Sequence, residues 1–151
     1  MKILLVAALV VFAFFSLGAD CEAPTTSPPA DSTTGEAEIV IRYSATTASQ
    51  VGSWSVAKPG HVYLIVSLDI ENRGYQSFSA SSFWFYAIVN QVKYSTAWVV
   101  IDDELPLVDL LDGGRISGKI VFEVPKQNGS VTYSLTYEPI FATYNIKWVR
   151  Q

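Results

Sequence analysis

The sequence predicts an all-β sandwich of about seven strands for residues 37–151. Apolar and polar side chains alternate with a period of two in seven segments, and turn-forming residues separate these segments. No segment shows a convincing helical period of 3.6 over ten residues. A domain of this length buries about two thirds of its unfolded surface, which is enough for a core without disulfides.

The first three strands are predicted at residues 39–43, 62–70 and 83–87. The second has the clearest pattern, because apolar residues occupy every other position from Val62 to Ile70. The sequence Asn72-Arg73-Gly74 is typical of a turn and ends this strand. In the third strand, Phe83 and Phe85 are expected to share one face of the sheet.

Four further strands are predicted at residues 94–101, 116–124, 131–137 and 144–148. The first of these is β-branched and aromatic throughout, and the second ends at Pro125. The pair Asn128-Gly129 favours a type I′ turn, so we predict a hairpin between strands 116–124 and 131–137. Asn128 also begins an N-x-S sequon, which makes it a candidate glycosylation site in an exported protein.

Four tryptophans are first interpreted as core or sheet-face residues, because large aromatic side chains bury much apolar surface. They are Trp54, Trp84, Trp98 and Trp148. The alternative interpretation is a ligand groove lined by tryptophan. The sequence alone leaves both interpretations open.

Residues 1–20 are predicted to form a secretory signal peptide or an N-terminal membrane anchor. Lys2 supplies a positive charge before an apolar run from Ile3 to Phe15. Residues 21–36 are rich in Pro, Thr and Ser and are predicted to be an extended, disordered linker. The chain is therefore expected to be exported, with its domain held away from the membrane or released.

Cys21, the only cysteine, follows the apolar run at the place where a lipoprotein signal has its lipidated cysteine. Asp20 departs from that pattern, because a small residue is expected before the cysteine. Three alternatives are therefore open: lipidation of Cys21, simple cleavage after Ala19, and an uncleaved anchor at the short limit of a membrane helix.

Composition excludes several classes of function. The net charge of −4 leaves no broad basic face for nucleic acid. One cysteine cannot form an internal disulfide, and with a single histidine it cannot complete a Cys/His zinc site. His61 is the only imidazole, and neither a G-x-S-x-G motif nor a phosphate-binding glycine fingerprint occurs. No catalytic residue and no cofactor are predicted, and the protein is not expected to be an enzyme.

Five carboxylates lie close together between the fourth and fifth predicted strands. They are Asp102, Asp103, Glu104, Asp109 and Asp112. Calcium prefers six to eight oxygen ligands, which carboxylates and loop carbonyls supply. Their spacing does not match an EF-hand, and leucines interrupt them. A solvated acidic loop is the first interpretation, and a weak Ca²⁺ site is the alternative.

Three stretches of the domain resemble the family called domain of unknown function 4352. They are the runs Pro59 to Gly74, Ser79 to Tyr86 and Asp112 to Pro125, including the N-x-G and F-x-V-P motifs. The resemblance implies an immunoglobulin-like antiparallel β-sandwich, similar to the mycobacterial immunoprotective extracellular antigen. It also implies an exported protein or lipoprotein of bacteria or archaea, and the acidic middle is similar to archaeal members. It implies no catalytic residue or cofactor.

Together these observations predict a non-catalytic binding or interaction module, tethered at the cell surface through a lipid or an anchor, or secreted. The expected partner is an envelope protein, a glycan or a neighbouring copy, and not a nucleic acid. Four aromatic residues, Tyr63, Tyr75, Phe78 and Trp84, are candidate contacts. The alternative is an extracellular domain that binds a small ligand or Ca²⁺ through residues 102–112.

Overall fold

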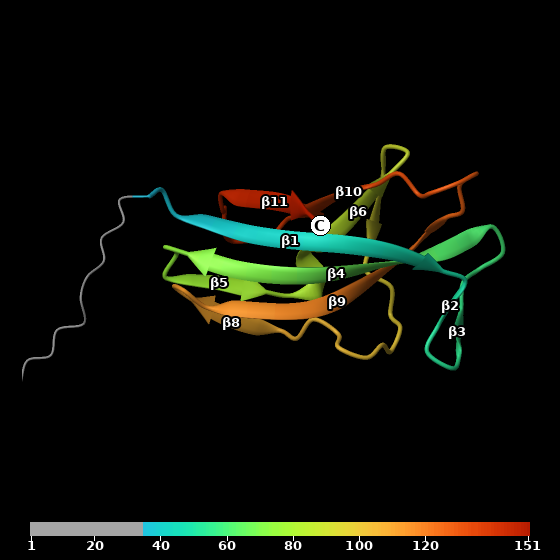
Figure 1. The fold of residues 1–151 in the computed structure, drawn as a ribbon, viewed down its shortest axis with the longest axis horizontal. Helices are drawn as coiled ribbons and strands as arrows, with labels where there is room; N and C mark the ends of the chain where they lie inside the picture. The colour runs from blue at the N-terminus through green and yellow to red at the C-terminus, as the bar shows by residue number, and fades with distance from the viewer. Residues whose placement is uncertain (1–34) are drawn as a thin grey trace, which may run out of the picture. The chain divides into compact units, whose positions relative to one another are not determined.

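Two layers of β-strands build the part of the chain that the computed structural model describes, residues 35–151 (Figure 1). The first layer is a four-stranded sheet in the order β11-β1-β4-β9. Its strands are β1 (Glu38–Ala48), β4 (His61–Arg73), β9 (Arg115–Pro125) and β11 (Ile146–Arg150). This sheet provides one wall of the core and, on its other side, the support for the candidate site.

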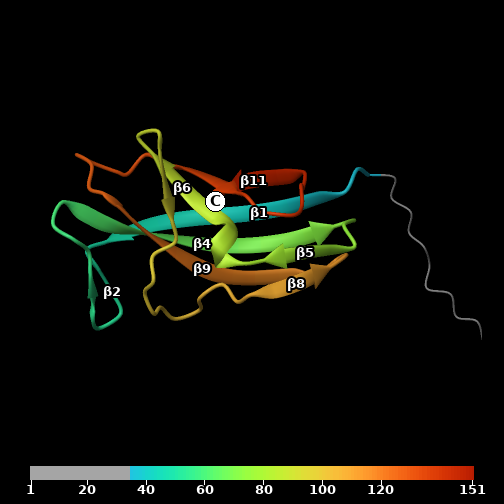
Figure 2. The same ribbon diagram turned by 180° about the vertical axis from the view of Figure 1, so that it is seen from behind.

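The second layer consists of shorter strands. A three-stranded sheet has the order β10-β6-β7, and β5 pairs with β8. Their bounds are β5 (Ser77–Ala80), β6 (Phe85–Val89), β7 (Val92–Ser95), β8 (Val108–Leu111) and β10 (Ser134–Tyr137). Seen from behind, β5, β6 and β8 lie on the near side of the long strands (Figure 2). The predicted all-β sandwich is confirmed.

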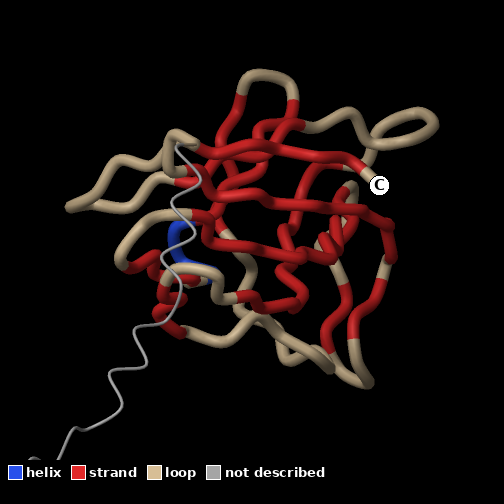
Figure 3. The backbone as a smooth tube through the Cα atoms, turned by 60° about the vertical axis from the view of Figure 1, so that its left-hand side comes forward, coloured by secondary structure: helices blue, strands red, loops and turns tan. Residues whose placement is uncertain are grey.

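Two small elements complete the described chain. A short hairpin is formed by β2 (Gln50–Val51) and β3 (Ser55–Val56). One turn of 3-10 helix, η1 (Ser82–Trp84), precedes β6 and is the helical element of residues 35–151 (Figure 3). Within the same residues, no helix has the length and apolar character needed to cross a lipid bilayer.

The main core lies between the two layers. Alternate residues of β4 point into it, and their antiparallel partners on β9 do the same, as in the pairs Leu64 with Phe122 and Val66 with Ile120. From the second layer, Phe78 of β5 and other aromatic side chains close the core. The alternation read from the sequence therefore identifies the inward face of β4 and β9 correctly.

The predicted strands exist, but several have different bounds or partners. Phe83 belongs to η1, so the third predicted strand begins two residues later, at Phe85. The strand predicted at 94–101 pairs regularly only as β7, which ends at Ser95. The strands β2, β3, β5 and β8 were not predicted. β11 pairs in parallel with β1, whereas the other pairings of the four-stranded sheet are antiparallel.

The predicted Asn128-Gly129 hairpin is wrong. β9 pairs with β4 and β10 pairs with β6, so the two strands on either side of the turn belong to different sheets. Only Gly129 has a positive φ, whereas a type I′ turn requires two such residues. The connection instead carries the chain from one layer to the other.

A turn does end β4 near the predicted Asn72-Arg73-Gly74, but the strand continues to Arg73 and the chain bends at Gly74. Asn72 organises this turn. Its side chain is fully buried, and its Nδ2 donates hydrogen bonds to the carbonyl oxygens of Tyr75 and Leu110, both at 2.8 Å. Its Oδ1 accepts a hydrogen bond from the Tyr75 amide at 3.1 Å. Gly74 has a φ of +93°, which favours glycine. Asn72 thereby fixes the end of β4 against β8.

The neighbouring Glu71 is the centre of an ion-pair cluster. Its buried carboxylate accepts hydrogen bonds from Arg73 at 2.8 Å and from Arg115 at 2.6 Å, and Arg42 lies at 3.4 Å. The hydrogen bond from Arg73, together with that from Arg115, lowers the pKa of Glu71 from its usual 4.5 to about 2. The arginines therefore compensate the charge of Glu71. The bond between Glu71 of β4 and Arg115 of β9 also helps to hold these two strands together.

Candidate functional site

The outer face of the four-stranded sheet carries a second apolar cluster. Side chains of a strand alternate between its faces, so Tyr63 and Ile65 of β4 point away from the main core. Val121 lies opposite Ile65 on β9, and Val51 of β2 joins the cluster. Because both faces of β4 are apolar here, the outer one must be covered by another part of the chain.

The segment 96–101 provides this cover. It is tied to β9 by a hydrogen bond of 2.7 Å from the Ala97 amide to the Val121 carbonyl oxygen. Ala97, Val99 and Ile101 pack on the outer cluster. The residues between them face solvent, and the Trp98 side chain is 91% exposed. The segment thus has the alternation of a strand, although residues 97–101 form no regular ladder.

A second connection holds the chain that follows. The Leu105 amide donates to the Lys119 carbonyl oxygen at 2.9 Å, and the Lys119 amide donates to the Asp103 carbonyl oxygen at 2.7 Å. Gly118 permits this contact, because a Cβ there would lie 2.5 Å from the Leu105 Cα atom. Glu104 is therefore fixed between two backbone hydrogen bonds to β9.

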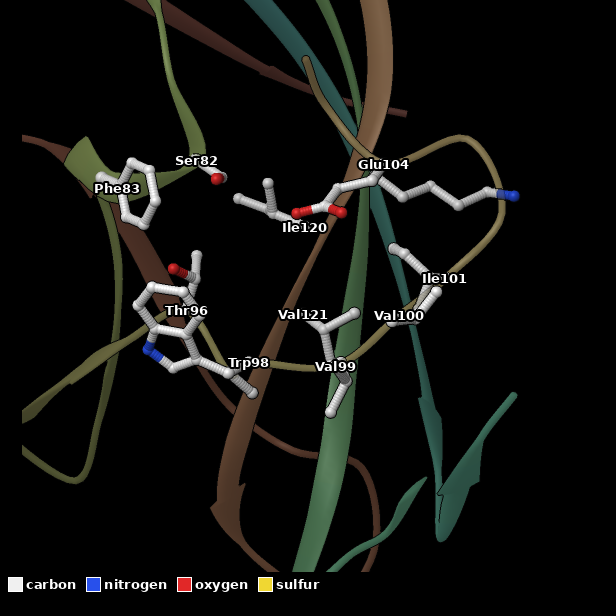
Figure 4. A pocket seen from close by; sticks show the side chains of 12 residues that line it. Ser82, Phe83, Thr96, Trp98, Val99, Val100, Ile101, Glu104, Ile120 and Val121 are labelled. Atoms are coloured by element: carbon white, nitrogen blue, oxygen red, sulfur yellow. The ribbon is translucent and has the colours of Figure 1, made fainter. Parts of the chain in front are cut away.

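These segments enclose a groove of about 350 Å³ on the surface (Figure 4). Phe83 and Trp98 lie at one end, with ring centroids 5.8 Å apart and planes inclined by 49°. The carboxylate of Glu104 lies at the other end, and Ile120 and Val121 lie between the two ends (Figure 4). The groove therefore has a mainly apolar lining, an aromatic end and an acidic end.

A wider hollow of about 720 Å³ adjoins the groove and shares Trp98, Val99, Val100 and Ile101 with it. Trp54, in the turn between β2 and β3, lines it and is 94% exposed. We call Trp54, Phe83, Trp98 and Val100 the aromatic face, since all four are exposed and border one or both hollows. Exposed apolar side chains gathered in this way are typical of an interaction surface.

Residues 31–146 match a family described as a domain of unknown function, DUF4352. The chain belongs to the DUF4352 family. The match covers most of the chain, so the resemblance read from its motifs is confirmed.

A crystal structure from Bacillus subtilis, described as a "putative lipoprotein (ycdA)", has a similar fold. Its sequence is 15% identical, the TM-score is 0.57, and the alignment covers 72% of this chain and 34% of the other. This DUF4352 chain thus spans about a third of that protein's length, and the likeness concerns the fold alone. No curated protein matches the chain.

The contact residues predicted for the DUF4352 domain are partly wrong. Tyr63 is buried under the segment 96–101, and Phe78 is fully buried in the main core, so neither offers a surface contact. Tyr75 and Trp84 are half-buried and pack against the same core. Periodicity placed Tyr63 on the outer face correctly, but it could not show that another segment covers that face.

The interpretation of the four tryptophans is right for two of them. Trp84 and Trp148 pack against the main core, as predicted. Trp54 and Trp98 are exposed, so the core interpretation fails for them. The groove beside Trp98 agrees instead with the alternative of a tryptophan-lined groove. The sequence did contain an indication that Trp98 is exposed. Residues 97–101 are apolar on both faces of the predicted strand, and only one of these faces can be buried.

The acidic residues have separate surroundings. Asp103 forms an ion pair with Lys119 at 3.0 Å, and Asp112 accepts a hydrogen bond of 2.6 Å from the Gly74 amide. Asp109 lies on β8, and Asp102 borders the wider hollow. Within residues 35–151, no three Asp, Glu, His or Cys side chains gather into a group suited to a metal ion. The calcium alternative remains a prediction that a metal titration tests.

The remaining predicted sites are single residues. Asn128 is exposed between β9 and β10, where a glycan has room, and its glycosylation remains a prediction. His61 begins β4, with its Nδ1 atom 3.3 Å from the Pro59 carbonyl oxygen. Cys21 and the predicted signal peptide lie outside the described residues, as does most of the predicted linker.

Proposed function

We propose that this protein is an exported protein of the cell envelope whose sandwich domain is a non-catalytic binding module. The observation that carries the proposal is the aromatic face, because it places two nearly fully exposed indoles beside two hollows. Tryptophan is enriched among the residues that dominate binding energy at protein interfaces. The partner is accordingly expected to contact Trp54 and Trp98.

Two further observations support the placement in the envelope. The N-terminal sequence has the layout of an export signal followed by a cysteine and a Pro-rich linker. The structurally similar protein of Bacillus subtilis is described as a putative lipoprotein. A module held by a linker outside the membrane is able to present its aromatic face to a neighbour in the envelope.

The binding role is tested by photo-crosslinking in cells that produce the protein naturally. A photoreactive phenylalanine replaces Trp98 in one variant and Phe141 in the control. Phe141 is a matched control, since it is aromatic, 97% exposed and lines neither hollow. We expect a discrete adduct from position 98 and none from position 141. Equal or absent adducts at both positions would refute the binding role.

The tether is tested by the intact mass of the protein purified from its native membrane fraction. A mass that begins at Cys21 with an added lipid supports the tethered lipoprotein, despite Asp20. A mass that begins at Asp20 without an adduct indicates a released protein. The same measurement reports a glycan on Asn128.

A further inference from the structure

We infer that the groove between Trp98 and Glu104 binds an arginine side chain from an extended segment of a partner protein. The inference rests on the proposed binding function and names the chemistry that the groove selects. Three properties carry it: the apolar length of the groove, the uncompensated charge at one end, and the aromatic rings at the other (Figure 4).

The shape of the groove fits a long side chain with a polar head. Most of its lining side chains are apolar, among them Trp98, Val100 and Ile101, and its volume of about 350 Å³ accommodates one long side chain with parts of its neighbours. The only charged side chains on its lining are Glu104 and Lys119. An aliphatic stem would therefore lie along the apolar lining while its head reaches the acidic end.

The charge of the groove selects a cation. Glu104 forms no ion pair with any side chain of residues 35–151. The nearby ammonium of Lys119 is held by Asp103 at 3.0 Å. Asp102 is a further acidic side chain close along the chain. Glu104 is exposed, so an incoming positive charge would meet an accessible carboxylate that has no ion-pair partner in residues 35–151.

The acidic end favours arginine over lysine. A flat guanidinium donates two parallel hydrogen bonds to a carboxylate, whereas an ammonium does not. Trp98 is nearly fully exposed and its ring is inclined by 49° to that of Phe83, so the aromatic end is open to the residues beside the arginine. The two ends of the groove thereby recognise different parts of one segment.

The test uses the purified protein and two blocked tripeptides, acetyl-Val-Arg-Val-amide and the same peptide with citrulline. Citrulline has nearly the shape of arginine but no charge, so the pair isolates the cation. Binding is followed through the indole N–H signal of Trp98 in the NMR spectrum, identified by its loss in Trp98→Phe. We expect the arginine peptide to shift this signal with a millimolar dissociation constant, and the citrulline peptide to bind roughly tenfold more weakly.

Two variants locate the charge. Glu104→Gln should weaken the arginine peptide roughly tenfold and leave the citrulline peptide unchanged. Asp109→Asn is the matched control, because it removes one exposed negative charge of the same acidic stretch outside the groove, and it should change affinity less than about twofold. Any of three results would overturn the inference. They are equal affinity for the two peptides, an unchanged affinity of Glu104→Gln for the arginine peptide, and a Trp98 signal that the arginine peptide does not shift.

Failure of this inference is distinguishable from failure of the proposed function. In one outcome, the adduct at position 98 persists undiminished in cells that carry Glu104→Gln, and the protein shows no selectivity for arginine in solution. This outcome overturns the arginine site but agrees with the binding module. Loss of the adduct in Glu104→Gln, with retention in Asp109→Asn, supports both the arginine site and the binding module. Absence of any adduct at position 98, with no shift of the Trp98 signal by either peptide, refutes both.

Discussion

Replacing Asn72 with aspartate is the sharpest test of how this fold is held together. The two side chains have nearly the same shape, so the change removes the Nδ2 donor and adds an ionisable carboxyl group with little effect on packing. Nδ2 donates to the carbonyl oxygens of Leu110 and Tyr75, both at 2.8 Å, and the Leu110 bond is buried. An aspartate oxygen at this place would face two carbonyl oxygens.

The expected cost follows from these contacts. The buried Leu110 carbonyl oxygen loses its donor, which costs about 2 kcal/mol, and the half-buried Tyr75 oxygen adds about 1 kcal/mol. Burial of a carboxylate at a position with no exposed area adds at least about 1 kcal/mol. The sum, about 4 kcal/mol, is a large share of the stability of a domain, which is typically about 5–15 kcal/mol.

The assay is urea unfolding of Asn72→Asp and wild type, followed by tryptophan fluorescence. Asn90→Asp is the control, because Asn90 is exposed in the β6–β7 turn and should cost less than about 0.5 kcal/mol. Burial raises the pKa of the new carboxyl. The loss in free energy of unfolding relative to wild type should therefore become smaller as the pH falls from 7 toward about 4. A deficit below about 1.5 kcal/mol, or one that is independent of pH, would refute the reasoning.

Three other predictions concern the edge of the sheet and the site. Gly118→Ala should destabilise the domain by about 1–3 kcal/mol in the same assay, because its Cβ would meet the Leu105 backbone at 2.5 Å, whereas Ser117→Ala, which is exposed, should not. Glu71 contributes stability above its unfolded pKa of about 4.5, and this is lost as the pH falls toward the folded value of about 2. Glu71→Gln should therefore flatten the acid limb of the stability curve, and an unchanged limb would contradict the ion-pair assignment. Trp98→Ala should change stability by less than about 0.5 kcal/mol, because the side chain is exposed. A loss comparable to a core truncation would show that Trp98 is structural.

The elements that were predictable from the sequence have strong local signals. β4 was found because its apolar residues alternate over nine positions and a turn sequence follows. β9 was found because it alternates and ends at Pro125. The elements that were missed are short: β2 and β3 have two residues each, and β5 and β8 have four each and pair with each other across a long stretch of sequence. Local patterns cannot report a partner that lies some thirty residues away.

The site likewise combines features that local sequence predicts with contacts that it does not predict. The sequence indicated that Trp98 and Glu104 belong to an apolar segment and an acidic stretch, but these are separate features of the chain. The groove exists because hydrogen bonds from residues 97 and 103–105 fasten both to the same strand, β9, and because η1 places Phe83 beside Trp98. These contacts are long-range, so no periodicity encodes them.

The sequence by itself determined the β class, the family and the turn that ends β4, because each depends on neighbouring residues. Only the tertiary structure decided which aromatic side chains are exposed. Tyr63 and Trp98 both lie on the outer side of the sheet, yet the chain that covers Tyr63 is the one that exposes Trp98. Which of two apolar faces is buried is settled by the segment that packs on it, and packing is a property of the whole fold.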